Sequence, residues 1–85
     1  MPQVSRFFGI IIAMYHDDHH PPHFHARYAG SEIQVGIADG RVNGDFPRRA
    51  RSLVLEWWSL HREELEANWR LIVEGREPNW IEPLE

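Results

Sequence analysis

Histidines crowd one short stretch of the sequence, residues 15–28, which reads YHDDHHPPHFHARY. Five of the six histidines in the chain lie inside a ten-residue part of this stretch, at positions 16, 19, 20, 23 and 25. Imidazole binds divalent metals, and it also exchanges protons near neutral pH. The stretch is therefore the candidate functional site of the chain, and its residue types indicate two possible roles: metal binding and acid–base catalysis.

Metal binding is the first interpretation of the cluster. His23 and His25 are two residues apart on a predicted strand, so their rings stand on one face at a backbone spacing of about 6–7 Å. A further ligand would come from the loop before them, from Asp17, Asp18, His19 or His20, and would complete a site with an open position. The chain has no cysteine, so the candidate ions are Zn, Fe, Mn and Ni, and the sequence does not choose among them.

Acid–base catalysis is the second interpretation. A histidine pair can hold one neutral and one protonated ring near pH 7. One ring would take the proton of an RNA 2′-hydroxyl and the other would protonate the leaving oxygen, while Arg27 neutralises the phosphate. Tyr15 and Tyr28 lie close by in the sequence. This set of residues fits metal-free cleavage of RNA.

A third interpretation is structural. Pro21 and Pro22, flanked by histidines and aromatic residues, can form a rigid corner of a sheet. His23 and His25 would then donate to backbone carbonyls, and Phe24 would fill the core. The residues by themselves leave all three interpretations open.

The elements that must position these residues can be read from hydrophobic spacing. Residues 7–15 are apolar on both alternating faces, which predicts one strand covered on both sides. Alternating patterns over 23–28 and 32–38 predict two further strands, with His23, His25 and Arg27 on one face. Asp39-Gly40 predicts a hairpin, and residues 41–43 a short return strand.

Residues 48–74 have the apolar spacing of a helix. One helix of that length would be roughly 40 Å long, so a break near residues 59–61 is expected. Pro47 and Asp45 fit its start, with Asp45 as a possible cap, and Gly75 fits its end. The predicted fold class is α+β: a small antiparallel sheet of three to four strands, followed by one long kinked helix or two helices packed on one face.

Composition narrows the class of protein. The 85 residues predict a single domain, 1–85, with a modest core that a homodimer would help to bury. The longest apolar run is too short to cross a bilayer, and no signal peptide is evident, so we expect a cytoplasmic protein. Residues 52–85 hold three arginines against eight acids, so any RNA contact should be local to the histidine and arginine face.

Four segments carry a resemblance to a known family. They are MYHDDHHPPHFHARY, NGDFPRRA, EWWSLHREELEANW and PNWIEPL, and they resemble the prokaryotic domain of unknown function 4160. The family pattern is a tyrosine, then Asp-His, one spacer and Pro-Pro-His-Phe-His. Asp18, His19 and residues 21–25 match it, so the resemblance favours His19, His23 and His25 over His16 and His20.

The resemblance implies a partner but no established activity. Members of the family often form half of a two-gene pair beside a small protein of unknown function 2442, and such pairs are suspected toxin–antitoxin modules. The first hypothesis is accordingly a component of a toxin–antitoxin-like pair, with a small protein partner encoded nearby and a histidine site that binds or cleaves RNA. The candidate catalytic residues are Tyr15, His19, His23, His25 and Arg27. The alternatives are a metal-binding module using Asp18, His19, His23 and His25, and a structural partner-binding domain without catalysis.

Overall fold

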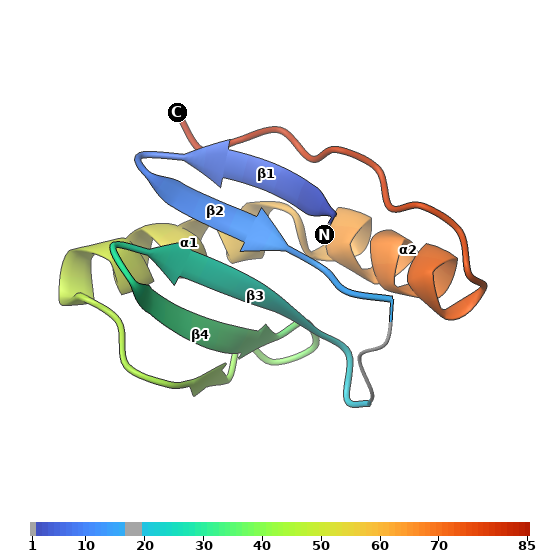
Figure 1. The fold of residues 1–85 in the computed structure, drawn as a ribbon, viewed down its shortest axis with the longest axis horizontal. Coiled ribbons are helices and arrows are strands. Elements are labelled where there is room, and N and C mark those ends of the chain that lie inside the picture. The colour runs from blue at the N-terminus through green and yellow to red at the C-terminus, as the bar shows by residue number, and fades with distance from the viewer. Residues whose placement is uncertain (1, 17–19) are drawn as a thin grey trace.

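A five-stranded antiparallel sheet is followed by two helices in the computed structural model, which describes residues 2–16 and 20–85 (Figure 1). The strands lie in the sheet in chain order, each antiparallel to the next. The elements are β1 (Gln3–Phe7), β2 (Ile10–Ala13), β3 (His23–Tyr28), β4 (Ser31–Gly36), β5 (Val42–Asn43), α1 (Arg48–Leu60) and α2 (Arg62–Val73). The predicted α+β class and the antiparallel sheet are confirmed.

The first apolar run is two strands, and the prediction of one strand over 7–15 is wrong. Phe8 and Gly9 have positive φ angles of 51° and 82° and turn the chain between β1 and β2. Phe7 pairs with Ile10 across this two-residue turn, a geometry that suits the twist of a hairpin. The sheet therefore has five strands, one more than the upper prediction. Hydrophobic spacing missed the turn because apolar residues continue through it.

The helical segment divides where the sequence suggested. His61 lies between α1 and α2, and its backbone N–H donates to the Trp58 carbonyl. Gly75 follows α2 with φ of 77°, and its N–H donates to the Ile72 carbonyl. The break and the end of the helical segment are thus confirmed. The predicted cap is wrong, because α1 starts after Pro47 without any side-chain cap hydrogen bond.

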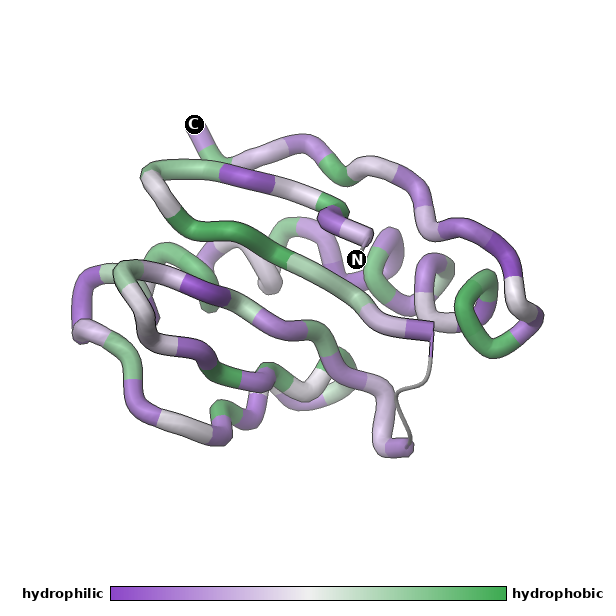
Figure 2. The backbone as a smooth tube through the Cα atoms, viewed as in Figure 1, coloured by the Kyte–Doolittle hydropathy of each residue, from purple (hydrophilic) through white to green (hydrophobic). Residues whose placement is uncertain are grey.

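The core lies between the helices and one face of the sheet. Figure 1 shows α1 behind the sheet and α2 running on beyond its right-hand end, and Figure 2 shows β2 as hydrophobic while polar residues alternate along β3. The fully buried side chains of the sheet include Ile10, Ile12, Phe24 and Val35, and Trp57 meets them from α1. No helix among residues 2–16 and 20–85 is long and apolar enough to span a membrane.

The segment after α2 returns along the edge of the sheet. The Ile81 N–H donates to the carbonyl of Val4, a residue of β1, at 2.7 Å. The Asn68 side chain makes two hydrogen bonds to the backbone of Asn79, at 2.8 and 2.9 Å. These contacts hold the tail against β1 and α2. Both helices of the described residues pack on the core side of the sheet, and none of them covers its other face (Figure 1).

Candidate functional site

Strand β3 carries the predicted site residues on the face of the sheet opposite its core-facing side chains. At the end of the strand, the ring of His23 also lies against Trp69 of α2, with 5.7 Å between the ring centroids. Phe24 and Ala26 are fully buried toward the core, so His23, His25 and Arg27 stand on the opposite face. The predicted alternation of this segment is confirmed. We refer to Tyr15, His23, His25, Arg27 and Glu32 as the open-face cluster.

The register of the sheet assembles this cluster. His25 pairs with Ala13 on one side and Gln34 on the other, and Arg27 pairs with Glu32. The rings of His23 and His25 have centroids 5.1 Å apart. Tyr15 lies edge-on to His25 with a centroid distance of 4.5 Å. Four of the five predicted catalytic residues therefore occupy one neighbourhood.

Hydrogen bonds at Nδ1 orient both histidine rings. The Nδ1 of His25 lies 2.9 Å from Oε2 of Glu32, and the Nδ1 of His23 lies 2.9 Å from the carbonyl oxygen of Pro21. A carboxylate and a carbonyl only accept hydrogen bonds, so Nδ1 donates in both cases and carries the proton. In a neutral ring this makes Nε2 the basic nitrogen, the atom that accepts a proton or binds a metal.

The two histidines differ in access to solvent. His25 is only 7% exposed, although it stands on the outer face, because Tyr15, His23 and Glu32 surround it. His23 is half-buried. A ligand at this face can therefore reach the half-buried His23 and the exposed Glu32, with the nearly buried His25 between them.

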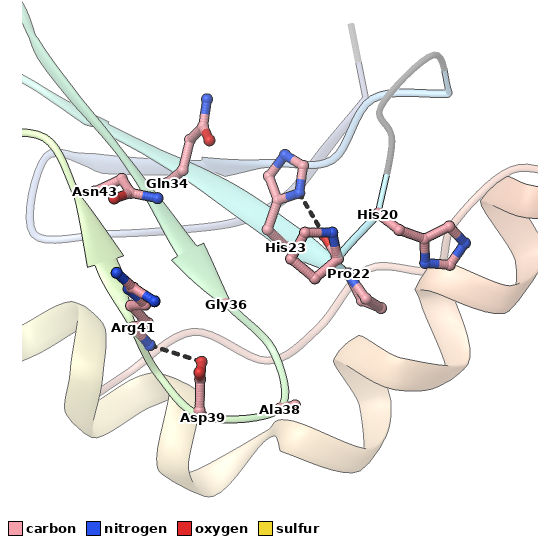
Figure 3. Close-up of a pocket in the computed structure, with 10 residues that line it drawn as sticks. His20, Pro22, His23, Gln34, Gly36, Ala38, Asp39, Arg41 and Asn43 are labelled. Atoms are coloured by element: carbon pink, nitrogen blue, oxygen red, sulfur yellow. Dashed lines mark hydrogen bonds between the residues drawn. The ribbon is translucent and has the colours of Figure 1, made fainter.

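A cavity of about 250 Å³ opens beside His23. The segment 20–22, strand β4 and the β4–β5 turn enclose it (Figure 3). Gln34 and Asn43, which pair across β4 and β5, contribute amides to its wall. Arg41 adds a guanidinium beside them. The cavity therefore places hydrogen-bonding groups and one positive charge next to a candidate catalytic ring.

Two other histidines of the stretch, His16 and His20, make contacts outside the open-face cluster. The ring of His20 packs edge-on against Trp69, with 5.6 Å between the ring centroids. It points away from His23 in Figure 3. The Nε2 of His16 lies 3.0 Å from the carbonyl of Arg76. The ring of His23 lies equally close to Trp69, so it is the direction of the His20 ring, and not this contact, that separates His20 from the cluster.

Two predicted metal ligands, Asp18 and His19, lie outside the described residues. Within residues 2–16 and 20–85, no three His, Asp or Glu side chains form a group that could hold a metal ion. The predicted metal site thus stays a prediction. His19 as a catalytic residue stays one for the same reason.

Sequence reasoning missed two residues at this site, Glu32 and Arg41. The alternation of 32–38 placed Glu32 on the polar face of its strand, but only the register with β3 brings it to His25. Arg41 follows the Asp39-Gly40 turn, and the length of that turn decides that it faces the cavity. A local sequence pattern predicts neither the contact between Glu32 and His25 nor the position of Arg41 at the cavity.

The fold and site define an α+β domain with a histidine-bearing open sheet face. The family model described as Domain of unknown function (DUF4160) matches residues 9–70, well over half of the chain. The chain belongs to this family, so the resemblance to domain of unknown function 4160 is confirmed at the level of the family. No curated protein and no solved structure matches the chain significantly.

Proposed function

We propose that this protein acts on RNA through the open-face cluster, as one component of a toxin–antitoxin-like two-protein module. The observation that carries the proposal is the pairing of His23 and His25, 5.1 Å apart between ring centroids, with Glu32 bonded to His25 at 2.9 Å. A carboxylate that fixes the tautomer of one histidine beside a second histidine is an arrangement suited to proton transfer.

The proposed chemistry is cleavage of a phosphodiester through the neighbouring 2′-hydroxyl. The Nε2 of one ring takes the 2′-hydroxyl proton, and the 2′-oxygen bonds to phosphorus. The bond from phosphorus to the 5′-oxygen breaks, and the other ring protonates that oxygen. The products are a 2′,3′-cyclic phosphate and a 5′-hydroxyl. Arg27, on the same strand face, would offset the negative charge that builds up on phosphate.

Burial distinguishes the two rings in this proposal. The half-buried His23 is the more accessible ring. His25, at 7% exposure, would reach the RNA only over the small part of its ring that stays accessible, and its hydrogen bond to Glu32 would orient it. Removing the Glu32 charge should therefore slow the chemical step more than it weakens binding.

Cleavage of a fluorogenic RNA oligonucleotide by tag-free protein tests the proposal. We expect His23→Ala to abolish cleavage and Glu32→Gln to lower kcat with KM nearly unchanged. The controls are His16→Ala, a histidine bonded to the Arg76 carbonyl, and Glu56→Gln, an exposed carboxylate on α1. Both should cleave like the wild type. Folded protein without cleavage, or cleavage that survives His23→Ala, would overturn the catalytic proposal.

The two-protein part of the proposal rests on the family resemblance and needs its own experiment. Expression of this chain alone should slow growth, and co-expression of the small protein encoded beside it should relieve the effect. The His23→Ala chain should be harmless yet still bind that partner. Growth inhibition that His23→Ala does not reduce would separate the module from the histidine site.

Metal binding is a second candidate, favoured by a specific observation. Histidines that ligate metals usually donate their other ring N–H to a carboxylate or a backbone carbonyl, and His25 and His23 donate to Glu32 and Pro21 in this way. Asp18 and His19 would supply the remaining ligands. Elemental analysis of tag-free wild type and of His23→Ala/His25→Ala tests it. About one equivalent of Zn, Fe, Mn or Ni, lost in the double variant, would support a metal site, and a metal-free wild type would exclude it.

A further inference from the structure

We infer that the cavity beside His23 binds one nucleotide of a single-stranded RNA, with Gln34 and Asn43 contacting the base and Arg41 the phosphate. This inference rests on the proposed function for its ligand class, RNA. It goes beyond that function because it assigns a substrate subsite to residues outside the open-face cluster.

The position of the cavity is the first argument. His23 belongs both to the cluster and to the cavity wall, so a nucleotide in the cavity would lie directly beside the reacting bond. At about 250 Å³ the space falls just below the usual range for drug-sized ligands, about 300–1,000 Å³. The space suits the base of one nucleotide, whose phosphate would lie at the exposed side chain of Arg41, while the rest of a strand would continue over the open face.

The amides of Gln34 and Asn43 are the second argument. They occupy paired positions on β4 and β5, and both side chains are exposed. Each amide offers a donor and an acceptor, which is what the edge of an unpaired base requires. Neither amide makes a side-chain hydrogen bond to the part of the chain that the structure describes, so both can serve a ligand without breaking a contact.

Arg41 is the third argument. Its side chain is exposed at the cavity, and its guanidinium can donate to a phosphate through two N–H groups. Its backbone is held by the turn, because the N–H of Arg41 donates to Oδ1 of Asp39 at 3.0 Å (Figure 3). The second charge at the cavity, the Asp39 carboxylate, is thereby directed to the turn itself.

Gly36 shows that this turn is closely built. A Cβ atom at Gly36 would lie 2.6 Å from Oδ1 of Asp39, so a larger residue would push the carboxylate off Arg41. The Gly36 N–H also donates to the Arg41 carbonyl at 2.9 Å. The position of Arg41 thus depends on a glycine at the end of β4.

Titration of ¹⁵N-labelled protein with the four nucleoside 5′-monophosphates, followed by NMR, tests the subsite directly. We expect the side-chain amide signals of Gln34 and Asn43 to shift. Arg41→Gln should weaken binding about tenfold, the loss expected for a hydrogen bond to a charged group. Asn43→Ala should reduce the difference in affinity among the four bases. The control is Arg49→Gln, an exposed arginine on α1 away from this cavity, which should bind like the wild type.

Cleavage assays on the same variants separate this inference from the proposed function. If the subsite is right, Arg41→Gln raises KM and keeps kcat. His23-dependent cleavage with no amide shifts, or with equal affinity in Arg41→Gln and wild type, would overturn the subsite and leave the proposed function intact. Nucleotide binding at Gln34 and Asn43 without any cleavage would support the subsite and overturn the catalytic proposal. Binding whose shifts centre on residues 48–51 would overturn the subsite.

Discussion

Gly40, in the turn between β4 and β5, is a position where one added methyl group should lower the stability of the fold. Its φ angle is +72°, and a Cβ there would lie 2.8 Å from two carbons of the Trp58 ring. That ring is held in place. Its Nε1 donates to the Ile37 carbonyl at 2.8 Å, and the guanidinium of Arg62 lies 4.9 Å from its centre. Trp58 can yield only by giving up these contacts.

The cost of Gly40→Ala has two parts. The left-handed backbone conformation lowers the free energy of unfolding by about 1–2 kcal/mol for a residue with a Cβ. Forcing a methyl group into a packed contact lowers it by about 1–3 kcal/mol more. Gly30→Ala is the matched control, because Gly30 has a φ of +84° and a Cβ there would meet no atom within 4 Å. Gly30→Ala should therefore show only the cost of the left-handed backbone conformation. Replacing glycine by alanine also lowers the conformational entropy of the unfolded chain, and this stabilising effect is the same in both variants.

Urea and thermal unfolding measure the difference between the two variants. In a domain of this size 1 kcal/mol corresponds to about 4–8 °C in Tm, so Gly40→Ala should melt well below Gly30→Ala. Gly40→Ala should also weaken nucleotide binding, since the turn carries Arg41. Equal losses in the two variants would refute the argument, because they would mean that Trp58 moves aside freely.

Three further changes have expected outcomes. Phe8→Asn should raise the free energy of unfolding by about 1 kcal/mol, because asparagine tolerates the positive φ of this turn; a loss in urea unfolding would mean that the ring of Phe8 stabilises the fold. Asn68→Ala should lower the free energy of unfolding by about 2–4 kcal/mol, because the backbone N–H and carbonyl of Asn79 lose their hydrogen-bond partner. Limited proteolysis should then cut the segment after α2. Trp57→Phe should cost about 1–3 kcal/mol, because a large buried ring is shortened and the bond to the Glu82 carbonyl is lost; an unchanged midpoint would contradict this.

Part of the candidate site could be predicted because it depends on one strand alone. In an extended chain, side chains alternate with a period of two. The segment HFHARY therefore had to place His23, His25 and Arg27 on one face wherever the strand lay. The break near His61 followed in the same way from the length of the helical pattern and the size of the chain.

Other features could not be predicted because they join residues from different strands. The hydrogen bond between His25 and Glu32 requires the register of β3 with β4, which a shift of one residue would destroy. The turn at Phe8 and Gly9 was missed because it lies inside an apolar run that continues from Phe7 into β2. The same limit applied to Arg41, whose place at the cavity depends on the exact length of a turn.

The sequence by itself determined the α+β class, the placement of the strands before the helices, and a strand with histidines on a single face. These properties follow from backbone periodicity and from the positions of glycine and proline. Only the tertiary structure decided that Glu32 orients His25, that His25 is nearly buried while His23 meets solvent, and that a cavity with Arg41 adjoins it. Those properties depend on strand register and on packing over a shared core, which bring together residues that no local pattern connects.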